Sequence, residues 1–162
     1  MKFIADGMLG KLARWLRLAG HDVTYIRDSN LPPEKQDDEL LQKARNEKRT
    51  LLTADVALHK RAIKAGLRST LIEGADIVSQ LVEISKHLGQ RIEIIPEKSR
   101  CPICNGPLEP VGKGKVEGLV PESVLKANSE FWRCTKCNKI YWKGKHWKSI
   151  IAMASKYNSK VG

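Results

Sequence analysis

The four cysteines of this 162-residue chain form two matched Cys-X-X-Cys pairs, both in its C-terminal part. Cys101 and Cys104 make the first pair and Cys134 and Cys137 the second, with 29 residues between the pairs. This arrangement can place four sulfurs tetrahedrally around one zinc ion, each at about 2.3 Å from it. Because four protein ligands leave no open coordination position, the sequence predicts a zinc ribbon that holds one structural zinc per chain.

Two other uses of the cysteines stay open, namely two disulfides or a redox-active pair. Disulfides are disfavoured because residues 1–6, MKFIAD, are typical of a short strand rather than of a secretory leader. A redox motif does not come as a matched pair. Asn105 and Asn138 follow the two pairs, and such residues tolerate the positive φ of turns in which backbone amides approach thiolates.

The first 90 residues alternate short apolar runs with longer runs of helical spacing. We expect strands over Lys2–Ala5, Asp22–Ile26, Arg49–Thr53 and Ser69–Ile72. Helices are expected over Met8–Ala19, Gln36–Glu47, Val56–Ala65 and Ala75–Leu88. Such alternation predicts βαβ units on a mostly parallel sheet, which binds ligands at the carboxyl ends of its strands.

The chain is long enough for one compact domain and a small appended module. We expect an α/β domain over 1–90, a connector over 91–99 and the zinc ribbon over 100–149, followed by a tail over 150–162. Arg91–Ile95 could be an edge strand or the start of the connector, and Ile151 onward could extend a helix before the tail frays.

The net charge of +11 is unevenly distributed. Residues 1–98 carry 17 Lys and Arg against 14 Asp and Glu, whereas residues 99–162 carry 12 against four. A basic excess favours a polyanionic partner such as nucleic acid, although a generally basic protein stays the alternative. No apolar run approaches the ~20 residues that span a bilayer. We therefore expect a cytoplasmic protein rather than a membrane or secreted one.

Three acidic positions fall where a parallel sheet would bring them together. Asp6 ends the first strand, Asp55 follows the third, and Asp37 and Asp38 open the second expected helix. Converging carboxylates form sites for hard divalent cations, so we expect Asp6, Asp37 and Asp55 to bind Mg²⁺ or Mn²⁺. Such a site can activate water for phosphodiester hydrolysis, which makes these residues and Asp38 the catalytic candidates.

Each acid also has a purely structural interpretation. Asp55 could cap its helix, Asp37 and Asp38 could favour a helix dipole, and Asp6 could sit in an ordinary turn. A fourth acid is not evident, because Asp76 is placed to cap a helix.

Cations lie on the first expected helix and in the ribbon. Lys11, Arg14 and Arg17 follow one flank of that helix beside Asp6 and could hold phosphates, or could simply face solvent. In the ribbon, aromatic residues alternate with cations, a pattern that suits single-stranded nucleic acid but also a small core. The ribbon cations expected to bind RNA are Arg133, Lys143 and Lys145.

The chain resembles a known family in several segments. These are residues 3–17 (FIADGMLGKLARWLR), 37–41 and 49–55 (DDELL and RTLLTAD), and 131–134 and 141–147 in the ribbon (FWRC and YWKGKHW). They are similar to motifs of the Mut-seven C-terminal RNase family, which belongs to the PIN-like nucleases. Ala54 departs from the pattern, because the family often has a basic residue there.

The resemblance implies a PIN-like three-layer α/β fold, metal-dependent ribonuclease activity and a zinc ribbon. The positions that match the acidic motifs are Asp6, Asp37 with Asp38, and Asp55. We therefore expect a Mg²⁺- or Mn²⁺-dependent ribonuclease acting on single-stranded or structured RNA. The alternative is a non-catalytic RNA- or ribosome-binding protein that retains the scaffold, and a DNA-binding regulator is a weaker one.

Overall fold

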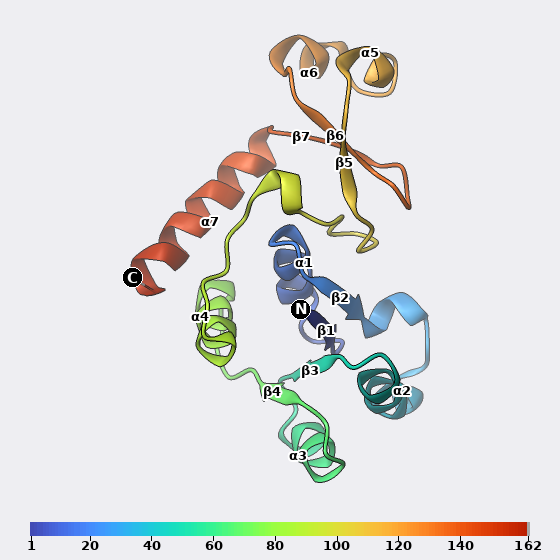
Figure 1. The fold of residues 1–162 in the computed structure, drawn as a ribbon, viewed down its shortest axis with the longest axis vertical. Helices are drawn as coiled ribbons and strands as arrows, with labels where there is room; N and C mark the ends of the chain where they lie inside the picture. Colours follow the sequence, from blue (N-terminus) through green and yellow to red (C-terminus); the bar gives the residue numbers. More distant parts are fainter. Residues whose placement is uncertain (162) are drawn as a thin grey trace.

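Four parallel strands form the sheet at the centre of the N-terminal part (Figure 1). They are β1 (Lys2–Ala5), β2 (Asp22–Tyr25), β3 (Thr50–Thr53) and β4 (Ser69–Leu71), and the sheet order is β2-β1-β3-β4. The computed structural model describes residues 1–161 of the chain. In its register Ala5 of β1 lies beside Tyr25 of β2 and Leu52 of β3, so the carboxyl ends of these three strands meet at one edge.

Helices cover both faces of this sheet. They are α1 (Gly10–Leu18), α2 (Pro33–Asn46), α3 (Val56–Lys64) and α4 (Ile77–Leu88). Because side chains alternate along a strand, Phe3 and Ala5 pack with α1 and α4, whereas Ile4 packs with α2 and α3. Both faces are therefore apolar, as expected of a parallel sheet, and the predicted three-layer α/β arrangement is confirmed.

Helix boundaries differ by up to three residues from those expected from the sequence, and the largest difference is at the start of α2. Helix α2 begins at Pro33 rather than at Gln36, because proline fits the first turn of a helix, where its missing N–H has no partner to lose. The turn before it is a short 3₁₀ helix, η1 (Ile26–Ser29). Arg91–Ile95 forms no strand and belongs to the connector, which ends in the 3₁₀ helix η2 (Pro96–Lys98).

The ribbon is a three-stranded antiparallel sheet of order β5-β6-β7. Its strands are β5 (Leu108–Val111), β6 (Phe131–Cys134) and β7 (Ile140–Trp142). Two short helices, α5 (Lys113–Val116) and α6 (Glu122–Ala127), connect β5 to β6 and lie at the end of the molecule farthest from the N-terminal sheet (Figure 1).

The C-terminal segment, which was expected to extend a helix before fraying into a tail, is helical as far as Val161. α7 (Lys145–Val161) leaves the ribbon and returns alongside α4 (Figure 1). Its anchor is Tyr157, whose side chain is 2% exposed and whose hydroxyl accepts the backbone N–H of Ile92 at 2.9 Å. The same hydroxyl hydrogen-bonds Ser85 of α4. None of the helices in residues 1–161 has the length and apolar character that a membrane crossing needs.

Candidate functional site

Asp6 stands at the carboxyl end of β1 and is held on both carboxylate oxygens. Its Oδ1 accepts the backbone N–H of Met8 at 3.0 Å, and its Oδ2 accepts that of Ala54 at 3.2 Å. The hydroxyl of Thr53 donates to the same Oδ2. The side chain is 7% exposed, and a buried carboxylate requires such partners to offset its lost hydration. These bonds fix its orientation.

Asp55 follows β3 and caps α3. Its Oδ1 accepts the backbone N–H groups of Ala57 at 2.8 Å and Leu58 at 3.2 Å, so the capping interpretation is confirmed. A carboxylate has a second oxygen, and Oδ2 of Asp55 makes no hydrogen bond within residues 1–161. Capping thus leaves one oxygen available for another ligand.

A pocket of about 180 Å³ brings three of the predicted acids together at the carboxyl edge of the sheet. Asp6 comes from β1, Asp55 from the end of β3, and Asp37 from α2. Asp37 is exposed, whereas Leu40, almost one turn later in α2, is buried in the core. The complete lining is Asp6, Gly7, Met8, Arg27, Gln36, Asp37, Leu40, Asp55 and Leu58.

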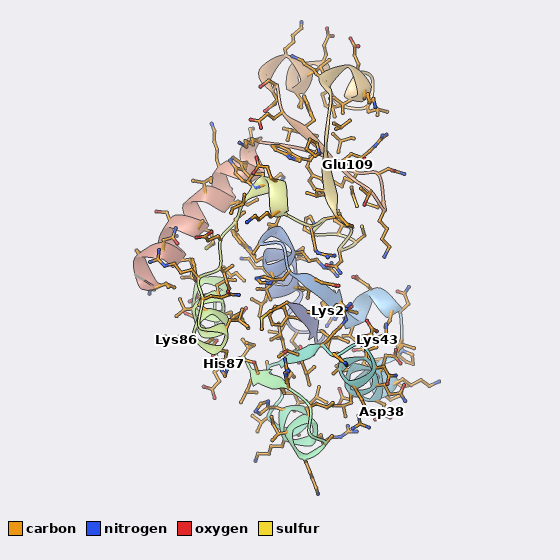
Figure 2. The ribbon with its side chains drawn as sticks, viewed as in Figure 1. Lys2, Asp38, Lys43, Lys86, His87 and Glu109 are labelled. Atoms are coloured by element: carbon orange, nitrogen blue, oxygen red, sulfur yellow. The ribbon has the colours of Figure 1, made fainter. Side chains whose placement is uncertain are left out.

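Asp38 lies outside this pocket, contrary to its place among the catalytic candidates. Consecutive helical residues point about 100° apart, and Asp38 pairs with Arg61 of α3 at 3.0 Å. Figure 2 labels Asp38 on the side of α2 that is toward α3. Asp38 therefore links two helices at the surface. Asp76 caps α4 by accepting the backbone N–H of Ser79 at 2.8 Å, and it is not among the pocket residues.

Arg27 lines the same pocket and carried no signal in the sequence motifs. It lies in η1, directly after β2, and therefore at the same edge of the sheet as Asp6. A Cβ on Gly7 would approach its Nε to 2.8 Å, so the absence of a side chain at Gly7 makes room for it. Only knowledge of the β1–β2 pairing could have placed Arg27 here.

The three cations expected on the first helix do not share one surface. Lys11 and Arg14 are exposed, but Arg17 is only 3% exposed and cannot reach an RNA in solution. Its Nε donates to the carbonyl of Val23 at 2.9 Å, and its Nη1 donates to that of Pro102 at 2.9 Å. Nη2 pairs with Asp28 at 3.2 Å. Arg17 thus joins the α/β domain to the first cysteine pair.

The four cysteines converge as predicted, with their sulfurs within 4.8 Å of one another. The Sγ atoms of Cys101 and Cys137 are 3.8 Å apart, and those of Cys104 and Cys134 are 3.3 Å apart. Sulfurs around a tetrahedral zinc lie about 3.8 Å apart for bonds of about 2.3 Å, so the cluster fits zinc. Within residues 1–161 it is the only group of three or more potential ligands this close together.

The turns of both cysteine pairs have the expected geometry. Asn105 and Asn138 adopt positive φ values of 70° and 65°. In the second pair the N–H groups of Lys136 and Cys137 point at the sulfur of Cys134, each at 3.4 Å. Burial raises the pKa of Cys134, but these N–H groups and the hydrogen bonds from the thiols of Cys104 and Cys137 outweigh it and lower the pKa to about 7. Burial raises the pKa of Cys104 to about 12, so the thiolate, the form that binds metal, is favoured at Cys134.

The first cysteine pair is docked against β2, the edge strand of the parallel sheet. Asn105 accepts the backbone N–H of Val23 through Oδ1 at 3.0 Å and donates to Asp22 through Nδ2 at 2.7 Å. Arg49 also donates to Asp22, at 2.9 Å. Burial raises the pKa of Asp22, but the bonds from Arg49 and Asn105 outweigh it and hold the pKa below its ordinary value.

The ribbon aromatics divide between core and surface. Phe131 and Trp132 are buried and belong to the core of the small sheet. Lys143 lies over the rings of Trp132 and Trp147, at 5.8 and 5.6 Å from their centres, and pairs with Glu130 at 3.7 Å. The remaining predicted RNA contacts are Arg133, which is half-buried on β6, and Lys145, which is exposed at the start of α7.

Comparison with known proteins gives one match. The model of the Mut7-C RNAse domain family matches residues 1–154, which include the acidic pocket and the cysteine cluster. Neither the curated proteins nor the solved structures gave a match.

Proposed function

This chain belongs to the Mut7-C RNAse domain family, and from that membership we propose that it is a metal-dependent ribonuclease. The observation that carries the proposal is the convergence of Asp6, Asp37 and Asp55 on one pocket at the carboxyl edge of a parallel sheet. This is where α/β folds of this kind bind their ligands. The three-layer arrangement with acids at that edge supports a PIN-like nuclease domain.

The pocket fits Mg²⁺ or Mn²⁺ in the chemistry of its donors. Carboxylate oxygens are the ligands that hard cations prefer. The three carboxylates are not as tightly grouped as the cysteines, and Mg²⁺ is commonly held by one or two carboxylates, waters and substrate phosphate. When bound, such a cation would stabilise the negative charge that develops on the phosphate, and it would lower the pKa of a bound water molecule.

The residues of the chain have distinct tasks in this proposal. Asp6 offers a carboxylate whose orientation is set by Met8, Thr53 and Ala54. Asp55 offers the oxygen that capping leaves available. In the hydrolysis, water adds to phosphorus, the bond from phosphorus to the leaving ribose oxygen breaks, and that oxygen takes up a proton. No covalent intermediate with the protein is expected.

The ribbon supplies RNA binding in this proposal, and its zinc has a structural role. The four cysteines would hold the zinc, and four unoxidised thiols fit a reducing compartment such as the cytoplasm. The exposed or half-exposed cations of α1 and of the ribbon with the start of α7 are the proposed contacts with single-stranded or structured RNA. They are Lys11, Arg14, Arg133, Lys143 and Lys145.

The experiment measures cleavage of single-stranded and hairpin RNAs in Mn²⁺, in Mg²⁺ or in EDTA followed by added Mg²⁺. Wild type should cleave with either cation, and Asp55→Asn should be slower by about 100-fold. Asparagine caps helices as well as aspartate does, so this variant should keep the fold. If Asp55→Asn cleaves as fast as wild type, the proposed site is wrong.

A non-catalytic RNA- or ribosome-binding protein is the second candidate. Ala54 supplies no cation beside the pocket, and no fourth acid lines it. In that case no RNA would be cut under any condition, while gel shifts would persist and weaken steeply with salt.

A further inference from the structure

Arg27 carries a positive charge that the protein does not neutralise. Three carboxylates line the same pocket, yet within residues 1–161 the guanidinium of Arg27 makes no ion pair and no hydrogen bond. Its neighbour Asp28 is directed to Arg17 instead, at 3.2 Å. Arg27 is also the only basic residue in the lining of the pocket. The charge is therefore free to meet an anion that enters from outside.

The backbone that carries Arg27 is firmly held. Ile26, the residue before it, is fully buried, and the hydroxyl of Ser29 donates to the carbonyl of Ile26. Tyr25 donates from its hydroxyl to the carbonyl of Gly7 at 2.8 Å, which ties the end of β2 to the turn after β1. The backbones of Arg27 and Asp6 consequently keep a fixed relationship at the edge of the sheet, and the exposed side chain of Arg27 extends from this fixed position.

Gly7 determines how the side chain of Arg27 lies. A Cβ at Gly7 would be 2.8 Å from Nε and 3.5 Å from Cγ of Arg27. The backbone at Gly7 does not need a positive φ, so alanine there would conflict only with the arginine side chain. Because Gly7 has no side chain, the side chain of Arg27 can pass directly over the backbone of Gly7.

We propose that Arg27 positions the substrate by binding a phosphate of the RNA inside the acidic pocket. A guanidinium presents a planar fork of N–H donors that matches phosphate oxygens. The carboxylates in the pocket cannot bind the phosphate themselves, because like charges repel. Arg27 holds the anion while the acids hold the cation. This inference rests on the proposed nuclease function and names a positioning residue for it.

The test compares Arg27→Gln, Arg27→Lys and Gly7→Ala with Arg68→Gln. Arg68 is an exposed arginine before β4, at the opposite edge of the sheet, and makes no ion pair within residues 1–161, so it is a matched control for the loss of one charge. Each variant is assayed for cleavage of one labelled RNA with Mn²⁺. The affinity of the same RNA is then measured without divalent cations over a range of salt concentrations.

Arg27→Gln should lower kcat/KM by about 10- to 100-fold, the value of a charged hydrogen bond to phosphate. Arg27→Lys should recover part of the loss, because it keeps the charge but not the fork. Gly7→Ala should displace the exposed side chain of Arg27 without removing its charge, so it should lower kcat/KM by less than Arg27→Gln does. In the binding assay Arg27→Gln should reduce the salt slope by about 1, as expected for one lost phosphate contact.

The outcomes separate the inference from the function on which it rests. If wild type cleaves and Asp55→Asn does not, but Arg27→Gln equals Arg68→Gln in both assays, the role of Arg27 is wrong and the nuclease stands. If Arg27→Lys, which keeps the positive charge, lowers the salt slope as much as Arg27→Gln does, the slope does not report a lost phosphate contact and that contact is wrong. If wild type cuts no RNA, the nuclease proposal fails, and an unchanged salt slope for Arg27→Gln would overturn the phosphate contact as well.

Discussion

Asn105 accepts the backbone N–H of Val23 through its side-chain oxygen at 3.0 Å, and this bond joins the first cysteine pair to the edge strand of the parallel sheet. An edge strand has a row of unpaired backbone groups, and β2 is such a strand. The ribbon therefore contacts the edge strand of the α/β domain in addition to forming its own small sheet.

We predict that Asn105→Ala costs about 1–3 kcal/mol more in free energy of unfolding than Asn138→Ala. Both asparagines follow a cysteine pair with a positive φ, so alanine strains the two turns alike. Of the two, only Asn105 also forms side-chain hydrogen bonds with the backbone N–H of Val23 and with the carboxylate of Asp22. Urea titration of zinc-loaded variants measures the difference, and equal costs would show that the contact with β2 contributes nothing.

Removal of zinc should loosen β2 although the metal lies outside the sheet. The backbone of the first cysteine pair holds Arg17 through the carbonyl of Pro102, and its turn holds Val23 through Asn105. Hydrogen exchange of the Val23 amide should therefore accelerate when a chelator removes zinc. The amide of Ile72, bonded to Thr53 at 2.8 Å on the far side of the sheet, is the internal control. Equal rates for Val23 with and without zinc would contradict the coupling.

His21 should make the protein less stable in weak acid. Burial, followed by the nearby N-terminal charge, lowers its pKa from 6.5 to about 4. Between these values the unfolded chain takes up a proton that the folded chain does not, so stability falls as the pH drops from 6.5 to 4. Denaturation at pH 7 and pH 5 should show a smaller loss for His21→Gln than for wild type.

Asp22 does not obscure this comparison. Its depressed pKa contributes stability that is present above its ordinary value of 3.8 and is lost only at lower pH. A His21→Gln protein that loses as much stability as wild type between pH 7 and pH 5 would contradict the assignment.

Tyr157 is predicted to anchor α7 through its hydroxyl. In Tyr157→Phe the N–H of Ile92 loses its acceptor and the hydroxyl of Ser85 loses its partner, at a cost of about 1–3 kcal/mol. Ser85→Ala removes only the hydrogen bond between Ser85 and the hydroxyl of Tyr157 and leaves the bond from the N–H of Ile92. It should therefore lower the free energy of unfolding by less than Tyr157→Phe does. Thermal melts compare the two variants, and a wild-type melting temperature for Tyr157→Phe would rule out the anchor.

Much of the α/β domain could be predicted because its signals are local. The apolar run Lys2–Ala5 and the run ending at Thr53 are strands in the structure, with ends within one residue of those expected. The carboxyl ends of parallel strands meet at one edge, so the positions of Asp6 and Asp55 in the sequence were enough to bring them together. Asp37 and Asp38 are adjacent in sequence, and only the packing of α2 on the sheet separates their roles.

The contacts that could not be predicted join residues distant in sequence. Arg17 follows Lys11 and Arg14 along one flank of the expected helix, and that pattern suggested an exposed cation. Its guanidinium instead donates to the backbone carbonyl of Pro102, 85 residues later. The apolar side chains of α7 that pack against the core recur at helical spacing, and they are Ile150, Met153, Tyr157 and Val161. This stripe indicates a helix, but no local pattern shows that the helix docks on α4. Arg27 enters the pocket because β2 pairs with β1, and no local pattern encodes that pairing.

The adjacent aspartates of α2 provide the most direct test of the acidic pocket. Asp37 lines the pocket and makes no ion pair within residues 1–161, whereas Asp38 pairs with Arg61 at the surface. Both are exposed, so asparagine at either position should leave the fold intact. Cleavage of one labelled RNA with Mn²⁺ should fall by about 100-fold in Asp37→Asn and stay near wild type in Asp38→Asn. Equal activity of the two variants, or a greater loss in Asp38→Asn, would contradict the assignment of this pocket as the nuclease site.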